Sequence, residues 1–458
     1  MVSLTSMRRL GVLFSTIVLS FSLIILLATG CAPKKVATDH IVLEMWIMPN
    51  SQEPVADLES VIAAFEKKHP KIKVKITSLD WGSAWQKITT AAISSDAPDV
   101  VQLGSTWVGS ITSMGANLDL KPMAAQINAQ KMFVPAAWST TGVVGSGQVN
   151  AIPWLMDVRA LYYRTDVFKK LGLSAKDIDT WEGLQATLRK IKKAELVING
   201  KKIQPLGITG KNDWNVIHNL APWIWAGGGE FLSKDLKTSN INSLASVKGI
   251  NFYTNLVKEG LVPLDCLELN TAQVSSAFNN GNYAIYIDGP YALKTLTTPP
   301  ERGGSADLPV AKNFAVAPYP KSPQGLRATF LGGSNLAVFK SSKNKKEAWE
   351  LIKFLTTDKE AQVAYSKLTG FLPALVTAFD DPYFSNDPFR KIYKDSVKFG
   401  KTYPCVPAWG PLETVVLTRR FGLFWDRLLK DPKGFDQEAI QDELNVAAKE
   451  MNSVLKKY

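Results

Sequence analysis

The stretch IVLEMWIMPNSQEPVADLESVIAAFEKKHPKIKVKITS, residues 41–78, holds the repeating pattern that decides the fold. Its first part, Ile41–Ile47, is rich in β-branched and aromatic side chains and predicts a buried strand. Val55–Lys68 places apolar side chains on one face of a helix. Pro70 ends this helix, because the residue before a proline is disfavoured in the helical region. Strict alternation in Ile72–Ile76 predicts a second strand.

The same order of strand and helix continues along the chain. Ser83–Ser94 has a helical pattern, and Pro98–Leu103 predicts a third strand. Strands that alternate with helices are typical of a doubly wound α/β domain with a parallel sheet. Further strands are expected at Leu161–Tyr163, Tyr283–Ile287, Phe314–Ala317 and Asn335–Phe339, and further helices at Asp166–Leu171 (capped by Thr165), Trp181–Ala194 (capped by Thr180), Ile217–Ala226, Lys248–Lys258, Asn270–Phe278, Tyr291–Leu296, Lys345–Leu355, Lys359–Leu368 and Gln437–Lys456.

The N-terminal segment has the features of a secretory signal peptide. Arg8-Arg9 precede the apolar run Leu10–Leu27, and the small residues Ala28–Gly30 stand directly before Cys31. The alternative is a membrane anchor, but a run of about 18 residues only just reaches the length of a span. The pattern resembles a bacterial lipoprotein signal, with Ala28 where the usual pattern prefers leucine. We therefore expect residues 1–30 to be removed, and lipid on Cys31 to tether the chain to a membrane without spanning it.

Composition narrows the class of protein further. The chain of 458 residues is too long for one ordinary core, so two domains are expected. The formal net charge is +12, but the lysines are spread along the chain and no nucleic-acid motif occurs, so no nucleic-acid partner is expected. The three histidines are isolated, and no zinc site can be recognised. Cys266 and Cys405 could form a disulfide in an exported protein, and the sequence leaves this open.

Eight fragments, taken in order, resemble the extracellular solute-binding lipoproteins of carbohydrate ABC importers, which are the family 1 solute-binding proteins similar to maltose-binding protein. Each fragment is weak alone, but their order behind a lipoprotein signal is specific. The fragments are FEKKHPKIKV (65–74), APDV (97–100), LYYRTDVFKKLG (161–172), TWE (180–182), AFNNGNYA (277–284), GGS (332–334), KSSKNKKEAWELIKFL (340–355) and FLPA (371–374).

The resemblance implies two α/β lobes joined by a multi-crossing hinge, the type II periplasmic-binding-protein fold, with a ligand cleft between the lobes. It implies no catalysis and no cofactor or metal. The expected partners are a sugar ligand, the transmembrane subunits of an ABC permease, and the membrane through lipid on Cys31, for a protein that is otherwise a monomer. The expected parts are 1–30 (signal), 31–40 (lipidated tether), 41–155 with about 328–370 (first lobe) and 156–318 with about 371–458 (second lobe).

Candidate ligand residues follow from where aromatic and polar side chains stand. A sugar presents an apolar face to aromatic rings and a hydroxyl edge to polar groups, which must stay paired when buried. Ligands in open α/β sheets bind at strand ends, and several of the 13 tryptophans occupy such places. For the first lobe, the resemblance implies Asn50, Ser51, Asp80, Trp81, Thr106, Trp107, Gly333 and Ser334, and just past the first crossing it implies Asp157. The alternative for Trp107 is the core of its own lobe, and Arg159 could be a structural partner of Asp157.

For the second lobe, the resemblance points to three groups of residues. Trp214, His218 and Trp223 surround the start of a helix, although their spacing would equally suit a core. Asp288 and Tyr291 lie in a loop that resembles one carrying a stacking aromatic ring in the family, and Trp409 and Glu413 resemble a late closing group. The number of aromatic residues favours an oligosaccharide.

Three other functions compete with sugar capture. A surface glycoside hydrolase would need two carboxylates beside a glycosidic bond, and Asp157 with Asp288 or Glu413 could be proposed. A carrier of a different solute, such as a polyamine, a glycerophosphodiester or a metal, would keep the fold. A structural surface protein with a degenerate pocket is the third alternative.

Overall fold

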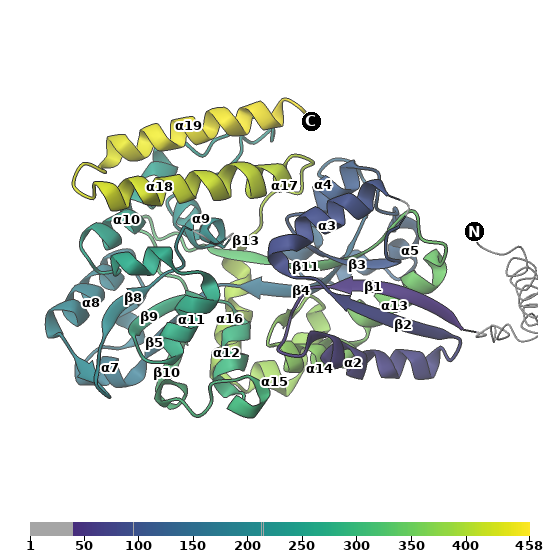
Figure 1. Ribbon diagram of the computed structural model, residues 1–458, viewed down its shortest axis with the longest axis horizontal. Helices are drawn as coiled ribbons and strands as arrows, with labels where there is room; N and C mark the ends of the chain where they lie inside the picture. The colour runs from purple at the N-terminus through teal and green to yellow at the C-terminus, as the bar shows by residue number, and fades with distance from the viewer. Residues whose placement is uncertain (1–39, 95, 212, 214) are drawn as a thin grey trace, which may run out of the picture. The chain divides into compact units, whose positions relative to one another are not determined.

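The strand pattern of the N-terminal region builds the first of two sheets. The computed structural model describes residues 40–94, 96–211, 213 and 215–458. Within this part of the chain the first sheet has the order β12-β4-β11-β3-β1-β2, with β13 beside β11 (Figure 1). Its strands are β1 (Ile41–Ile47), β2 (Ile72–Ser78), β3 (Val100–Gly104), β4 (Ile152–Val158), β11 (Thr329–Val338), β12 (Leu372–Pro373) and β13 (Gly400–Lys401). Leu43, Met45 and Ile47 of β1 are fully buried, as their alternation predicts.

The second sheet is built from the middle of the chain. Its order is β10-β5-β9-β8, formed by β10 (Phe314–Ala317), β5 (Ala160–Arg164), β9 (Tyr283–Asp288) and β8 (Gln204–Gly207). β5 is antiparallel to both β10 and β9, and β8 is parallel to β9. A separate hairpin joins β6 (Val197–Ile198) to β7 (Lys201–Lys202). We call each sheet with the helices packed on it a lobe.

The expectation of a parallel first sheet is wrong. β1 and β3 are parallel, but β11 is antiparallel to both β3 and β4. β11 reaches this sheet from the second sheet rather than through a crossover helix, so nothing forces it to run parallel to its neighbours. The sheet is therefore mixed, and only its first three strands follow the simple strand–helix alternation.

The chain passes between the two sheets several times. The first crossing is the single residue Arg159, between β4 and β5, and the second is the segment 318–328, between β10 and β11. β12 and β13 then return to the first sheet at 372–373 and 400–401, inside the segment that the sequence assigned to the second lobe. Residues Val42–Tyr458 form one compact unit, and the lobe limits predicted from sequence stay a prediction.

Helices cover both sheets, and α18 and α19 pack side by side (Figure 1). The bounds are α2 (Pro54–Lys68), α3 (Trp81–Ile93), α4 (Val108–Ser113), α5 (Lys121–Gln126), α6 (Pro135–Trp138), α7 (Thr165–Lys170), α8 (Trp181–Ala194), α9 (Val216–Ala226), α10 (Leu244–Lys258), α11 (Thr271–Asn279), α12 (Pro290–Thr297), α13 (Lys345–Thr357), α14 (Lys359–Thr369), α15 (Pro382–Ser385), α16 (Pro388–Ser396), α17 (Trp409–Pro411), α18 (Thr418–Lys430) and α19 (Gln437–Leu455). The Thr180 cap of α8 is confirmed, since its side chain accepts from the Gly183 N–H. The Thr165 cap is wrong, because Thr165 is already the first helical residue of α7.

Two cysteines are buried and unpaired. Cys266 donates its thiol to the Ile208 carbonyl, and Cys405 lies 3.7 Å from the Thr140 carbonyl. Burial raises the pKa of both thiols. The disulfide that the sequence left open is therefore not formed. Among the described residues no helix is long and apolar enough to cross a membrane, and Cys31 with the signal segment lies outside them.

Candidate ligand-binding site

A cavity of about 1070 Å³ lies between the two lobes, at the edge where β1, β3 and β9 end. This volume is at the upper end of the range of small-molecule pockets. Its lining comes from both lobes, which is the arrangement expected of a cleft that closes around a ligand. No cluster of three or more potential metal-binding side chains occurs in the described part of the chain.

Two tryptophans form the aromatic wall on the first lobe. Trp81 begins α3, and Trp107 follows β3, with ring centroids 5.5 Å apart and nearly perpendicular planes. Trp81 is half-buried, whereas Trp107 is only 5% exposed and also belongs to the core of the lobe. Trp107 therefore belongs to the core and also lines the cavity, and its contact with a ligand stays a prediction. Gly104, the last residue of β3, lies beside both rings and also lines the cavity.

Amide side chains fix the polar part of the same wall. Gln102 of β3 donates to Asn50 Oδ1 at 3.0 Å and to Ser334 Oγ at 2.8 Å. Asn50 in turn donates to Gln102 Oε1 at 2.9 Å and to the Tyr365 hydroxyl at 3.1 Å. Asn50 and Ser334 line the cavity, while Gln102 is fully buried behind them. Their positions are set before any ligand arrives, which lowers the cost of ordering them.

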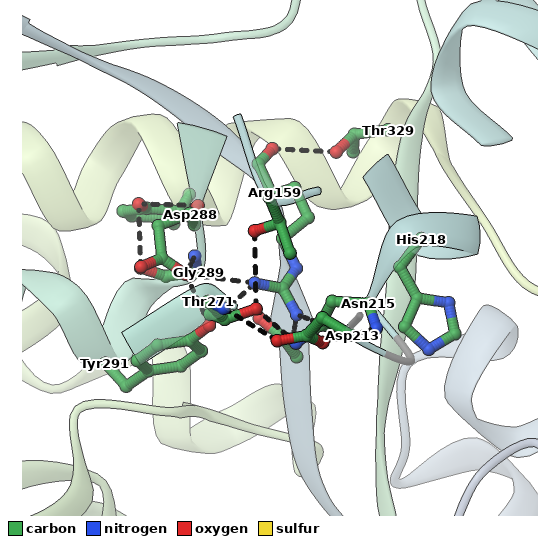
Figure 2. Close-up of polar contacts among 12 residues, drawn as sticks. Arg159, Asp213, Asn215, His218, Thr271, Asp288, Gly289, Tyr291 and Thr329 are labelled. Atoms are coloured by element: carbon green, nitrogen blue, oxygen red, sulfur yellow. Dashed lines mark hydrogen bonds and ion pairs between the residues drawn. The ribbon is translucent and has the colours of Figure 1, made fainter. Parts of the chain in front are cut away.

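Arg159 lies at the centre of a buried ionic cluster at the first crossing (Figure 2). Its guanidinium lies 2.9 Å from Asp157 Oδ2 on β4 and 3.0 Å from Asp288 Oδ1 at the end of β9. It also donates to the Tyr291 hydroxyl at 2.7 Å and to Asn215 Oδ1 at 2.9 Å. Asp157 therefore belongs to the first sheet, and the other partners belong to the second lobe. One side chain thus joins both lobes.

The cluster contains more negative than positive charge. Burial raises the pKa of Asp157, against the lowering effect of Arg159 and His218. Burial likewise raises the pKa of Asp288 to about 6, although Arg159 and the Tyr291 hydroxyl oppose this shift. Burial also disfavours the charge of Arg159, but Asp157 and its other partners hold its pKa well above the usual value. Asp157 Oδ1 is buried and has no hydrogen-bond partner, so the cluster has unused acceptor capacity.

His218 forms a second buried group beside the first. Its ring stacks on Phe330 of β11, with centroids 4.0 Å apart, and both residues line the cavity. His218 Nδ1 lies 3.1 Å from the Tyr403 hydroxyl, and Nε2 lies 3.4 Å from Glu413. Glu413 stands in a π-helical turn, Leu412–Leu417, and is 2% exposed. It supports His218 from behind and does not itself reach the cavity.

Eleven of the residues implied by the resemblance line the cavity: Asn50, Ser51, Trp81, Thr106, Trp107, Asp157, His218, Asp288, Tyr291, Gly333 and Ser334. Contact with a ligand stays a prediction for each of them. Gly333 has φ +130, and a Cβ there would lie 2.0 Å from the Leu155 carbonyl oxygen, so only glycine fits this close approach of the backbone.

Four other implied residues do not line the cavity, and Trp214 lies outside the described residues. Asp80 is exposed and caps α3 by accepting from the Gly82 N–H at 2.9 Å. Trp223 is fully buried and stacks on Tyr253 at 5.2 Å. Trp409 is fully buried as well, and Glu413 lies behind His218. Trp223 thus occupies the core position that its spacing would equally suit, and Trp409 lies in the core as well.

The sequence reasoning missed one polar wall of the cavity. It is formed by one face of α11 and the residues before it: Asn270, Thr271, Ala272, Ser275, Ser276, Asn279 and Asn280. Asn270 caps α11 through a reciprocal pair of bonds with Gln273. The sequence predicts a helix over Asn270–Phe278, and the small polar residues at helical spacing on one face indicate that this face does not pack in a core.

The fold and the cavity define a two-lobed α/β binding protein. The chain belongs to the bacterial extracellular solute-binding proteins, whose family model matches residues 49–362. The galactooligosaccharide-binding protein of Bacillus subtilis is 22% identical over 436 residues, covering 92% of this chain and 94% of that protein. The family and the two-lobe fold implied by the sequence are thereby confirmed.

Two solved structures are similar over almost their whole length. The sugar-binding protein MalE from Xanthomonas citri has a TM-score of 0.73 and 25% identity, covering 91% of this chain and 98% of that one. UgpB from Mycobacterium tuberculosis, in complex with glycerophosphocholine, has a TM-score of 0.74 and 19% identity, covering 91% and 99%. The second likeness concerns the fold alone.

Proposed function

We propose that this protein is the receptor of an ABC importer and captures a saccharide, of oligosaccharide size, between its two lobes. The observation that carries the proposal is the composition of the cavity wall. An aromatic surface formed by Trp81 and Trp107 lies on the same wall as a set of fixed amide and hydroxyl groups, of which Asn50 and Ser334 are examples. Sugars need this combination, and a sugar-binding relative and a sugar-binding structural neighbour support it.

The strength of binding is consistent with the groups present. One stacked ring contributes about 0.5–1.5 kcal/mol beyond the burial of area. One hydrogen bond to a charged group contributes about 1.5–3 kcal/mol. A few of each, less the cost of ordering and closure, reach the roughly 8 kcal/mol of micromolar binding.

A glycerophosphodiester is the second candidate ligand, favoured by the cations Lys294 and Arg302 in the cavity lining. It has a polyol part that the polar wall would accept. Its phosphate would also need a cationic partner. Arg159 is already shared by Asp157 and Asp288. Lys294 and Arg302, which also line the cavity, are therefore the cations left for it. The saccharide remains the first choice because the tryptophan wall suits a sugar and because a relative and a structural neighbour bind sugars.

We further propose that the protein catalyses no reaction. A glycoside hydrolase needs carboxylates that are free to reach the glycosidic bond. Asp157 and Asp288 both pair with Arg159, and Asp288 is only 1% exposed. These contacts favour a role in which the carboxylates hold the wall in place. A turnover assay with aryl-glycosides tests this, and release of the aryl group above the rate without protein would contradict it.

The anchoring is also a proposal. Lipid on Cys31 would hold a monomeric receptor beside its permease outside the cytoplasm, and the family of extracellular binding proteins fits this place. Expression of the full chain with Cys31→Ser tests the anchor. We expect the variant to leave the membrane fraction and to keep its ligand, and a variant that stays in that fraction would contradict lipidation.

The ligand class is tested by a thermal-shift panel. The panel contains mono- and oligosaccharides, polyamines and glycerophosphocholine, because binding to the native state alone raises the Tm. We expect a Tm shift with one saccharide series. Asp157→Asn should abolish this shift and Asp80→Asn should leave it unchanged, since Asp157 lines the cavity and Asp80 does not. A shift with glycerophosphocholine or a polyamine alone would overturn the saccharide and keep the fold.

A further inference from the structure

The rim of the cavity contains a place where the two lobes already touch. Gln52, before α2 of the first lobe, packs against Gly303, which follows α12 of the second lobe. A Cβ on Gly303 would lie 2.9 Å from Gln52 Cγ, and Gly303 has φ +76. Both residues line the cavity. The positive φ favours glycine at position 303.

A second glycine, Gly370 of the first lobe, makes a close contact with helix α12 of the second lobe. Gly370 ends α14 of the first lobe with φ +86 and presses on α12. A Cβ there would lie 2.7 Å from Lys294 Cβ and 2.9 Å from Tyr291 Cα. α12 packs against α14, so the contact belongs to a real helix–helix interface (Figure 1). One glycine from each lobe, Gly303 and Gly370, thus lies in close contact with the other lobe around α12.

Unpaired charges of opposite sign line this part of the cavity. Glu53 and Asp57 stand at the start of α2, and Lys294 and Arg302 stand on α12 and directly after it. Among the described residues none of these four side chains has an ion pair within 4.0 Å. Burial, Arg302 and Arg390 lower the pKa of Lys294, while Asp57 partly offsets them. Asp57 therefore lies close enough to act on Lys294 without pairing with it.

We propose that these residues form an electrostatic clasp, in which the acidic rim of the first lobe, Glu53 and Asp57, attracts the basic rim of the second lobe, Lys294 and Arg302, and favours the closed state. The effect of the clasp does not depend on any contact between these four residues and the ligand. It shifts the balance between open and closed states, and a ligand that binds the closed state gains from that shift. The attraction is between exposed or half-buried groups, so salt screens it.

The first test measures the distance between the lobes without any ligand. Spin labels on Lys71→Cys and Lys234→Cys, both exposed, report this distance by electron–electron resonance, while the native thiols are buried. The screening length falls from about 30 Å at 0.01 M salt to about 3 Å at 1 M. We expect the mean distance to lengthen with salt in the wild type. No change with salt would overturn the clasp.

Charge reversal makes the test specific. Asp57→Lys and Lys294→Asp should each lengthen the distance at low salt, and the double variant should restore it. Matched controls are Glu59→Lys, on the exposed side of α2, and Lys433→Asp, in the loop between α18 and α19. Failure of the double variant to restore the distance, or an equal effect of the controls, would overturn the proposal. So would an effect of Lys294→Asp seen only with inorganic phosphate present, because Lys294 would then be an anion site.

The second test measures affinity and rests on the proposed function. For the saccharide that shifts the wild-type Tm, we expect each single reversal to weaken binding about two- to fivefold, because an attraction between exposed charges of the two rims becomes a repulsion. The double variant should regain most of the affinity. If no saccharide binds the wild type, the proposed function fails while the distance measurement still decides the clasp. Equal affinities in all four proteins would overturn the clasp alone.

Discussion

Tryptophan has opposite roles in two regions of this molecule. Trp81 stands at the end of a strand of the first sheet and faces the cavity, with part of its ring exposed. Trp223 stands inside α9 and is fully buried among Trp181, Tyr253 and Tyr319. Side-chain chemistry is the same in both regions. The difference teaches that the place of a ring within its element decides whether it can meet a ligand.

The largest expected effect is the loss of stability when the buried ring of Trp223 is removed. Trp223→Ala should lower the free energy of unfolding by about 3–5 kcal/mol, because it removes a large buried ring and leaves a cavity. Urea unfolding measures this loss. Trp223→Phe is the milder control and should cost less. An alanine variant that unfolds like the wild type but loses its ligand would place Trp223 in the binding site.

A second prediction concerns the charged part of the cavity wall. Asp288 has a pKa raised to about 6 from 3.8, first by burial. Its native form binds a proton more readily than the unfolded chain does. The stability that it contributes is therefore fully present below pH 3.8 and is lost as the pH rises through about 6. Asp288→Asn removes this dependence.

The measurement is the difference in free energy of unfolding between the wild type and Asp288→Asn. We expect the difference to fall by about 2–3 kcal/mol as the pH rises through this range. Other carboxylates whose pKa is lowered, such as Glu259 and Glu450, give the opposite trend but are shared by both proteins. A difference that stays constant, or rises with pH, would contradict the raised pKa.

The cavity side of the comparison is tested by binding. Trp81→Ala should weaken saccharide binding about tenfold, since a stacked ring contributes about 0.5–1.5 kcal/mol beyond area. Trp85→Ala is the matched control, because Trp85 lies on the same helix and also contacts Trp107, at 5.5 Å, but does not line the cavity. Calorimetry should find its affinity unchanged. Equal losses in both variants would mean that the rings act only through packing.

The smallest expected effect tests whether Asp80 acts as the cap of α3 and not as a ligand contact. Asp80→Ala should cost about 1 kcal/mol of stability, because the first turn of α3 loses its capping bond. The saccharide affinity should not change, since Asp80 is exposed and outside the cavity lining. Asp80→Asn keeps a capping oxygen and should behave as the wild type. A clear loss of affinity in the alanine variant would return Asp80 to the site.

Much of the fold could be predicted because local patterns determine it. The strand at Ile72, the helix at Pro54 and the cap at Thr180 all follow from periodicity and capping chemistry over a few residues. The direction of β11 could not be predicted in this way, because it depends on which sheet the chain has just left. Its partners in β3, such as Gly104 opposite Ser334, are more than two hundred residues away in sequence.

The site was predictable to the extent that it lies at strand ends. Asp288 is the last residue of β9, Trp107 comes three residues after β3, and both line the cavity. Trp409 does not, because it is fully buried and its ring stacks on that of Tyr403 with centroids 4.4 Å apart, a contact that spacing in the sequence cannot reveal. The polar face of α11 was missed for the opposite reason. The polar face of α11 lines a cavity only because the first lobe lies opposite it, and the local sequence of the helix does not contain that information.

The two buried thiols have a consequence for how the protein is made. Cys266 and Cys405 are free and enclosed, and their raised pKa values keep them in the unreactive protonated form. No crosslink between them holds the fold together, so folding after export needs no oxidase or isomerase for these residues. The melting temperature should be the same with and without a reductant. The receptor can therefore be produced in a reducing cytoplasm or in an oxidising compartment with the same result.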